Sequence, residues 1–308
     1  MKTSISTHWL SPSTRVWALI GASWFLIHMP MAHSRPINLT HAATPMERVL
    51  INNTAGSVTV YGWKRDAVHV SGTLGAGSER LAVHARKGWI RIRVVLPEYA
   101  MNVRGTHLVV DVPIASRLVV KTVSAEIQAS GLAGVAHLKS VSGNVLLQSQ
   151  SHVITVKSVS GTVRIAGSAP LARIRAQTVS GGVSFQAIRG WVRASSVSGS
   201  IQASDHLRMT RALLHSTSGN VRFDGPVLSQ GRYVLTSVSG DIDVLLSPHP
   251  DARFYVSTLS GSIRNNFGPS ARRQSAYGPG RILDFVSGKH GASVKIHTLS
   301  GDITLRAR

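Results

Sequence analysis

The chain has 308 residues, with 34 lysines and arginines against 13 aspartates and glutamates, and a formal net charge of +21. This excess favours anionic partners such as nucleic acid, anionic lipid or polysaccharide, although it also serves solubility. No cysteine is present, which excludes disulfides, thiolate metal sites, a cysteine nucleophile and a lipid-modified N-terminal cysteine.

The N-terminus has the pattern of a secretory signal peptide over residues 1–34. Basic residues precede an apolar stretch at residues 16–29, which is short for a transmembrane helix. Small residues favour cleavage after Ser34, with Ala42 and Ala43 as alternatives. We therefore expect an exported protein in the periplasm, at the outer-membrane surface or secreted, with an uncleaved membrane anchor as the other interpretation.

The next region is predicted to be a linker over residues 35–47, followed by irregular early coils over residues 48–112. Residues 53–58 contain a degenerate copy of a turn that recurs later in the chain. Alternating apolar residues predict strands separated by polar turns. The expected strands cover residues 58–63, 67–73, 81–86, 89–96 and 108–112.

A turn of the form Val/Leu-Ser-Gly-x-Val/Ile then recurs through the rest of the chain. Its copies are 18 to 21 residues apart, except for a last interval of 40, and one copy carries Ala125 in place of glycine. Such a period indicates a repeat array in which each unit buries its apolar face against its neighbours. The glycines predicted to be structural are Gly143, Gly161, Gly181, Gly199, Gly219, Gly240, Gly261 and Gly301.

Apolar and polar residues alternate on both sides of each turn. In one repeat Ile154 and Val156 precede the turn, and Val163 and Ile165 follow it. This is typical of strands with one buried face. A Ser or Thr always stands three residues before the glycine, as Ser158 does here, and its parity predicts a buried row of hydroxyls. The glycine itself is expected to allow a positive φ in the turn.

Two strands and two turns per repeat predict an all-β fold, a single-chain parallel β-solenoid (β-helix) with coils of about 18–21 residues. The regular coils are expected over residues 113–264. An antiparallel sandwich is less favoured, because a sandwich has no reason to place the same residue type at the same offset in every unit.

The C-terminal part is predicted to contain an interruption over residues 265–291 and a final coil over residues 292–308. Residues 265–280 are rich in Gly, Pro, Asn and Arg, which predicts a projecting loop in place of the missing turn. Arg306 and Arg308 would charge the edge of the last strand and discourage its pairing with another chain.

Four segments besides the Ser-Gly turns carry a family resemblance: residues 108–113, 116–124, 277–291 and 298–303. In them the chain resembles the bacterial putative-adhesin family of β-strand-repeat proteins, a domain of unknown function in envelope and secreted proteins. The resemblance covers about residues 48–308 and implies a repeat fold with no assigned catalytic residue. The chain departs from the family pattern at Ala125 and in its basic balance.

Lysine and arginine recur at outward positions of the strand before the turn. Stacked coils would set these like charges about 5 Å apart, which is unfavourable. A polyanion laid along them would relieve the repulsion; the equally weighted alternative is an ordinary solvated face that resists aggregation. The candidate anion-binding residues are Lys121, Lys139, Lys157, Arg173, Arg175, Arg193, Arg211, Arg232 and Arg253.

Aromatic side chains are scarce on this strand, where only Trp191 and Tyr255 are expected. Nucleic-acid readers interleave basic and stacking residues, so base recognition is disfavoured. The expected partner is an anionic polymer: lipopolysaccharide, an acidic glycan or a nucleic-acid backbone.

Residues that could carry chemistry are few. Asp241 and Asp243 are the only close carboxylate pair in the repeats, where paired carboxylates would serve glycan cleavage. The histidines, among them His137, His215 and His297, lack metal-ligand spacing. We therefore expect no catalytic residue, metal, cofactor or small-molecule substrate.

The sequence thus predicts an exported, non-enzymatic β-solenoid that acts as an adhesin-like binding or scaffolding protein of the cell envelope. Two alternatives stay open. The first is an enzyme acting on acidic polysaccharide, which a carboxylate cluster in a groove would favour. The second is an envelope-stress or assembly accessory protein without a ligand of its own, which an uncharged apolar face would favour.

Overall fold

A computed structural model of the chain describes residues 34–99, 103–289 and 291–308. The predicted signal peptide, apart from Ser34, lies outside the described residues. All described strands belong to one compact unit, His33–Arg308. Within the described ranges no helix is long and apolar enough to cross a membrane.

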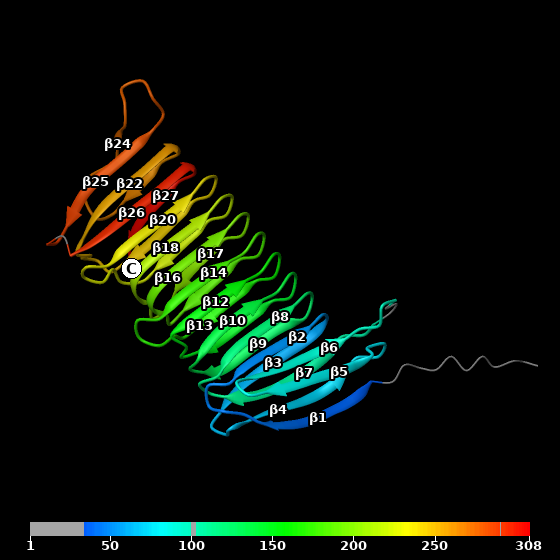
Figure 1. Ribbon diagram of the computed structural model, residues 1–308. Helices are drawn as coiled ribbons and strands as arrows, with labels where there is room; N and C mark the ends of the chain where they lie inside the picture. Colours follow the sequence, from blue (N-terminus) through cyan, green and yellow to red (C-terminus); the bar gives the residue numbers. More distant parts are fainter. Residues whose placement is uncertain (1–33, 100–102, 290) are drawn as a thin grey trace, which may run out of the picture. The chain divides into compact units, whose positions relative to one another are not determined.

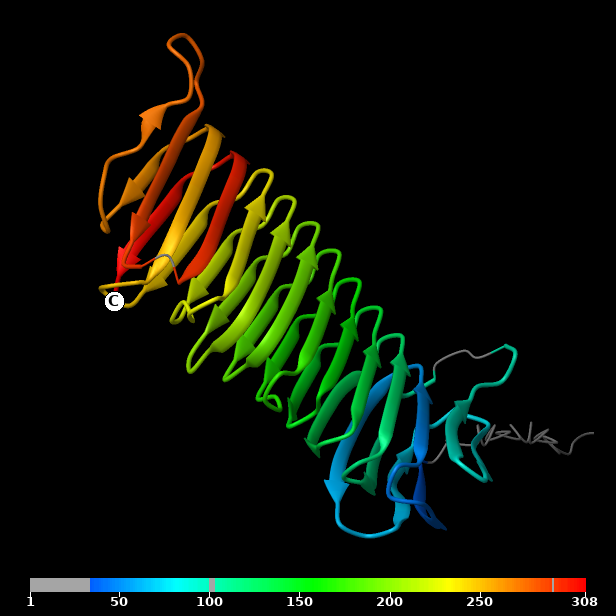
Figure 2. The same ribbon diagram turned by 60° about the vertical axis from the view of Figure 1, so that its left-hand side comes forward.

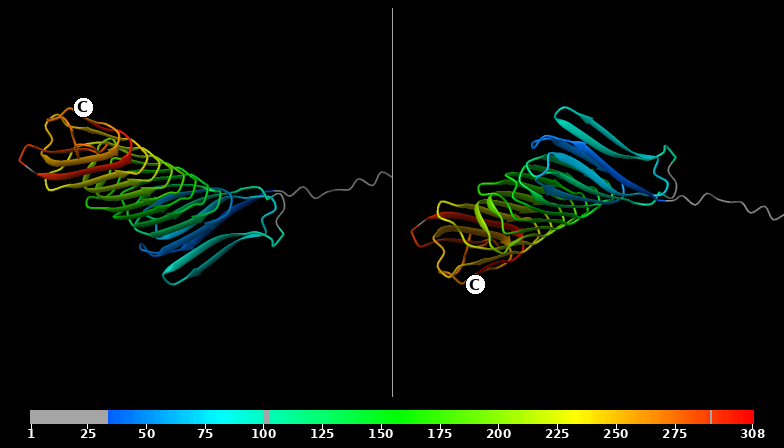
Figure 3. Two further views of the ribbon diagram at one scale, coloured as in Figure 1. Left: turned by 90° about the horizontal axis from the view of Figure 1, so that it is seen from above. Right: turned by 90° about the horizontal axis from the view of Figure 1, so that it is seen from below.

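The unit is all-β and consists of two large, mostly parallel sheets, seen from several sides in Figures 1 and 3. Buried side chains from both sheets form one continuous core. The thirteen-stranded sheet contains, in spatial order, β1 (Arg35–Ala42), β4 (Ala67–Leu74), β7 (Thr106–Pro113), β3 (Gly56–Trp63), β9 (Glu126–Leu132), β11 (Val145–Ser149), β13 (Val163–Ala166), β15 (Val183–Gln186), β17 (Ile201–Ser204), β19 (Val221–Asp224), β21 (Ile242–Leu246), β27 (Ile303–Ala307) and β23 (Ile263–Asn265). The fourteen-stranded sheet contains β24 (Arg272–Arg273), β25 (Arg281–Ser287), β22 (Ala252–Ser260), β26 (Ala292–Ser300), β20 (Arg232–Ser237), β18 (Arg208–Ser216), β16 (Arg189–Ser196), β14 (Arg173–Gln177), β12 (Val153–Lys157), β10 (Val135–Lys139), β8 (Arg117–Thr122), β2 (Arg48–Asn53), β6 (Trp89–Val95) and β5 (Arg80–Arg86).

From β8 to β21 each repeat adds one strand to each sheet, in parallel and in register. Val145 pairs with Val163 and Val163 with Val183 in the thirteen-stranded sheet, and Ile154 pairs with Ile174 in the other. All five side chains are buried. The predicted alternation and the rung-on-rung pairing are therefore confirmed over the regular repeats.

The row of Ser and Thr side chains before the turns is buried, as predicted. The Ser216 hydroxyl accepts the N–H of Gly219 at 2.9 Å and donates to the carbonyl of Gly199, one coil back, at 3.1 Å. Ser237 makes the equivalent bonds to Gly240 and Gly219. These bonds satisfy a polar group inside the stack and fix each turn to its neighbour.

The turn glycines are needed for close stacking, which corrects the predicted reason for them. A Cβ built on Gly181 would lie 2.1 Å from the carbonyl oxygen of Gly161, and one on Gly199 would lie 2.1 Å from that of Gly181. None of the turn glycines from Gly143 to Gly240 has a positive φ. The repeat therefore conserves glycine because the coil beneath leaves no room for a methyl group.

Ala125 replaces the turn glycine because its neighbouring coil turns differently. Ser57 pairs with Glu126, so Ala125 stacks on Gly56, whose φ is 104°. The backbone N–H groups of Ser124 and Ala125 both donate to the carbonyl of Thr54. This altered backbone path leaves space for the alanine side chain, which is fully buried.

The N-terminal coils stack out of sequence order. β2 pairs with both β6 and β8, and β3 pairs with both β7 and β9, so the first coil lies inside the stack and the β6–β7 coil outside it. Antiparallel strands then cover this outer coil: β4 and β1 beyond β7, and β5 beyond β6. Residues 35–42, predicted to belong to a linker, form β1 because they pair along their whole length with β4.

The C-terminal coils are also interleaved, as Figure 2 shows. β26 pairs with β20 and β22, and β27 pairs with β21 and β23, so the last coil lies between two earlier ones. The prediction that Arg306 and Arg308 charge the outer edge is wrong for this reason. Antiparallel β25 and β24 cover the edge of β22 instead, which protects it from pairing with another chain.

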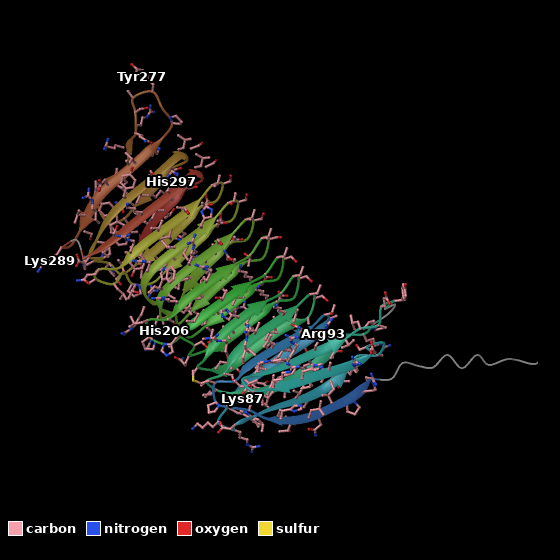
Figure 4. The ribbon with its side chains drawn as sticks, viewed as in Figure 1. Lys87, Arg93, His206, Tyr277, Lys289 and His297 are labelled. Atoms are coloured by element: carbon pink, nitrogen blue, oxygen red, sulfur yellow. The ribbon has the colours of Figure 1, made fainter. Side chains whose placement is uncertain are left out.

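The predicted projecting loop lies between β24 and β25 (Figure 4). Tyr277 on this loop is fully exposed. The interruption is only partly loop, because β25 pairs along its length with β22. The antiparallel strand β25 therefore occupies part of the region that the sequence predicts to be an interruption of the repeat.

Candidate anion-binding face

The outer face of the fourteen-stranded sheet holds all the candidate cations. In each regular strand every second side chain points outward, which gives three outward side chains per strand. The parallel register stacks these side chains in three columns. On β8 these columns contain Arg117, Val119 and Lys121. We use the term cationic face for the outward side chains of β5, β6, β2, β8, β10, β12, β14, β16, β18, β20, β26 and β22.

Lysines form one continuous column on β8, β10 and β12. Lys139 pairs in register with Lys121 on one side and Lys157 on the other. All three side chains are exposed, and neighbouring strands are about 4.8 Å apart. Like charges directly opposite one another are destabilising, so this column needs solvent, counterions or an anionic ligand.

Arginines occupy the other two columns. Arg173 and Arg211 lie in the first column, where Trp191 separates them. Among the predicted candidates, two arginine pairs lie in register: Arg175 with Arg193, in the middle column, and Arg211 with Arg232, in the first column.

Arg253 differs from the other candidates because a carboxylate compensates it. Ser293 on the interleaved β26 separates it from Arg232. Its Nη2 lies 3.0 Å from Oδ2 of Asp284 on β25. Asp284 is the only carboxylate at an outward position among the described residues of this sheet. Arg253 therefore belongs to the face but not to its uncompensated part.

The cationic face continues into the N-terminal strands, whose arginines are not among the predicted anion-binding residues. Arg48 on β2 pairs with Arg117 on β8. They stand eight residues before Gly56 and Ala125, the offset at which Arg173 precedes its own turn glycine. The same spacing rule, applied to the degenerate first turn, could have identified both residues.

The β5–β6 hairpin adds a denser group of arginines. The guanidinium carbons of Arg86 and Arg91 lie 5.9 and 5.1 Å from the ring centre of Trp89, a cation–π arrangement that orders them. Together with Arg80 and Arg93, which is labelled in Figure 4, they line a hollow of about 470 Å³. No repeat offset reveals these residues, because a hairpin replaces the turn here.

His137 lies in the middle column, among cations. Burial lowers the pKa of His137, and the neighbouring charges of Arg117, Arg48 and Lys139 lower it further. A partly buried histidine with cations nearby resists protonation. Burial and the positive potential of this face therefore both favour the neutral form of His137.

The outer face of the thirteen-stranded sheet also carries charges, and towards its C-terminal strands several of these are paired. Asp243 lies 2.7 Å from Nη2 of Arg306 and 3.5 Å from Nη1 of Arg222. Arg308 contacts Asp224 on the same face. The two sheets share one core but differ in how their outer charges are compensated.

The predicted carboxylate pair gains a third member from the interleaved last coil. The N–H of Asp302 donates to Oδ1 of Asp241 at 2.8 Å, and with Asp243 they line a hollow of about 610 Å³. A hydrogen bond from the backbone N–H of Ser262 lowers the pKa of Asp302, whereas a general acid needs a raised pKa. No group of three metal-ligating side chains occurs within the described ranges.

No family model matches the chain, and no curated protein matches it. The solved structures similar to it include proteins named as adhesins. A putative adhesin from Parabacteroides distasonis is 10% identical, with a TM-score of 0.46, over 90% of this chain and 98% of that one. A putative adhesin from Bacteroides fragilis is 12% identical, with a TM-score of 0.39, over 88% and 97%. A putative lipid binding protein from Parabacteroides distasonis is 9% identical, with a TM-score of 0.38, over 88% and 96%. The adhesin names agree with the family resemblance drawn from the sequence.

Proposed function

We propose that this protein is an extracytoplasmic, non-enzymatic and adhesin-like binding module of the cell envelope. Its two sheets are the two sides of a single parallel β-solenoid, which gives the ligand a rigid, regularly spaced surface. The ligand is anionic and lies on the cationic face. The candidate polymers are lipopolysaccharide, acidic glycan and nucleic-acid backbone.

One observation carries the proposal: like charges are stacked in register without carboxylates between them. Lys121, Lys139 and Lys157 are direct neighbours, and so are Arg175 and Arg193. Such pairs oppose folding by a few tenths of a kcal/mol each or more. A polyanion would turn this repulsion into binding energy, since each bound group then neutralises several neighbouring cations.

A requirement for solubility alone does not account for this distribution. The other sheet places Asp243 between two arginines, which shows that the same repeat accepts carboxylates at outward positions. On the cationic face the only outward carboxylate among the described strands is Asp284, near one end. The charge is therefore concentrated on one side, as surfaces that attract anionic polymers are.

The aromatic residues on the face are too few for recognition of bases. Trp89, Trp191 and Tyr255 lie on separated strands, whereas single-strand readers provide a series of stacking platforms. We therefore expect recognition of phosphate or carboxylate groups. Arginine suits both because its planar donors bind them in bidentate fashion.

The hollow with three aspartates is the best argument for the alternative of a polysaccharide-active enzyme. A lowered pKa at Asp302 favours its ionised form, and Asp243 is engaged by Arg306. Glycoside hydrolysis needs one carboxyl group that stays protonated. A binding role is therefore the better supported conclusion.

The test is a binding measurement with charge-reversed variants of the His33–Arg308 unit, which contains the described strands and the core. The probes are lipopolysaccharide, polygalacturonate and double-stranded DNA, each at low and physiological salt. We expect R175E/R193E to weaken binding roughly tenfold or more, and salt to weaken it further, because screening reduces the range of exposed charges to about 8 Å.

The matched control is R164E/K64E, which changes the net charge by the same amount. Arg164 is exposed on β13 of the other sheet, and Lys64 is exposed in the turn after β3. Equal losses in both variants would leave only attraction to bulk charge. Unchanged affinity in both would make the face an ordinary solvated surface.

A further inference from the structure

An exposed apolar row lies along one edge of the cationic face. Most of its members are Val or Leu residues that directly precede Ser in the turns, and they are 45 to 49% exposed. Thr217 and Val238, which are less exposed, complete the row. In spatial order this apolar ridge contains Val123, Val141, Val159, Val179, Val197, Thr217, Val238, Leu299 and Leu259.

The ridge is continuous from coil to coil. The N–H of Val159 donates to the carbonyl of Val141, and the N–H of Val179 donates to that of Val159, both at 3.1 Å. Figure 1 shows the corresponding turns in a single row along one side of the stack. At about 4.8 Å per strand, the nine positions extend over roughly 40 Å.

The ridge borders the cationic face directly. Val123, Val141 and Val159 each stand two residues after a member of the lysine column. Strand β26 continues through Leu299 to Ser300. Because side chains alternate between the two faces of a strand, the side chain of Leu299 points to the same side as that of His297. One side of the molecule therefore combines a broad cationic surface with an apolar edge.

The fold does not require apolar side chains on this ridge. Thr217 occupies the same position as the valines, and its carbonyl still accepts the N–H of Val238, at 3.2 Å. The hydrogen bonds that join the turns come from the backbone and from the buried hydroxyl row. Half-exposed valines are thus apolar surface beyond what the turn needs, and contiguous exposed apolar surface marks an interaction site.

We infer that the cationic face and the apolar ridge together dock on an anionic lipid surface, with the ridge against the headgroup and acyl boundary. The inference rests on the proposed function and names its ligand class. A soluble polyanion would use the cations but not the valines, whereas an anionic leaflet offers charge and an apolar layer together. A flat array of columns also suits a planar surface, because many cations reach it at once.

The experiment measures co-sedimentation of the His33–Arg308 unit with vesicles of phosphatidylcholine alone, or mixed three to one with phosphatidylglycerol. We expect binding to the mixed vesicles only. Each lysine or arginine lost from the face should lower the partition coefficient about fivefold, so K139Q/K157Q should lower it more than tenfold. Circular dichroism checks that each variant remains folded.

The decisive variant is V141T/V159T/V179T/V197T, which extends the natural example of Thr217 to four further coils. It keeps every charge and the β-branched shape, and it should lower vesicle binding about tenfold or more while binding of soluble polygalacturonate stays unchanged. The control L39T/I114T removes two exposed apolar side chains outside the ridge and should leave both unchanged.

The outcomes separate this inference from the proposed function. Binding to soluble polyanions but not to mixed vesicles would overturn the lipid surface and leave the proposed function standing. Vesicle binding that the four valine substitutions do not weaken would overturn the role of the ridge. Absence of binding to every anionic probe would overturn both.

Discussion

The two outer faces of this protein both carry arginines on stacked parallel strands, but the charges around these arginines differ. Arg222 and Arg306 on the thirteen-stranded sheet share Asp243. Arg175 and Arg193 on the fourteen-stranded sheet face each other without a carboxylate. Both faces rest on the same inner layer of Val and Ile, so the repeat itself does not demand either arrangement.

The fourteen-stranded sheet thus keeps an arrangement of charges that lowers the stability of the free protein. Neighbouring like charges cost free energy, and the paired face shows that the cost is avoidable within this architecture. A surface that keeps this unfavourable arrangement is the basis for the proposed binding of an anionic partner. Substitutions can change three features separately: the shared inner layer, the turns that stack it, and the outer charges.

The largest effect should come from the inner layer. I201D places a carboxylate at a fully buried position, while Q202D places one on the next, exposed residue of β17. An unpaired buried charge costs more than about 4 kcal/mol, so I201D should abolish cooperative unfolding in urea. Q202D should change the free energy of unfolding by less than about 0.5 kcal/mol. Similar losses in the two variants would refute a common inner layer.

The stacked turns offer a matched glycine pair. The added methyl group of G181A would lie 2.1 Å from the carbonyl oxygen of Gly161, whereas that of G182A meets nothing closer than 3.5 Å. We expect G181A to lower the free energy of unfolding by about 1–3 kcal/mol through overpacking, and G182A to leave it nearly unchanged. Thermal melts of the two proteins check this. A tolerated G181A would mean that the coils are not held at this distance.

Substitutions that remove arginine charges should change the free energy of unfolding in opposite directions on the two faces. R175Q/R193Q removes a repulsive pair and should raise the stability of the free protein by about 0.5 kcal/mol. R222Q/R306Q leaves Asp243 without its partners and should lower it by up to about 1 kcal/mol. Urea denaturation at low and high salt measures both, and salt should shrink each difference. Two effects of the same sign would remove the contrast between the faces.

The smallest effect concerns His137, which reports the potential of the cationic face. Burial first, and then Arg117, Arg48 and Lys139, lower its pKa from 6.5. The unfolded chain then takes up the proton at a higher pH than the folded protein does, so stability should fall as pH falls through the interval between these two pKa values. NMR titration should find that R117Q raises the pKa of His137. An unchanged value would show that Arg117 contributes little to this potential.

Much of the architecture could be predicted from the repeat, because local features carry it. Alternation around each turn identified the buried side chains, and the spacing of Ser and Thr located the hydroxyl row. The parity of Lys139 and Arg175 placed them on the outside of one sheet, where both are found. The identity of the proposed ligand could not be predicted in this way, since outward residues contribute little to the pattern that specifies the fold.

Local spacing is sufficient to predict the period, the inner layer and the sheet on which the cations lie, because each depends on a few neighbouring residues. The order of the coils at both ends is visible only in the folded protein. Every parallel strand presents a similar edge, so the local pattern of β26 is compatible with several positions in the sheet. Antiparallel hairpins and long connections decide which of these positions β26 occupies. That choice brought Asp302 beside Asp241, set Ser293 between Arg232 and Arg253, and joined Arg48 to the cationic face. These contacts depend on partners far away in the chain, and no local spacing encodes them.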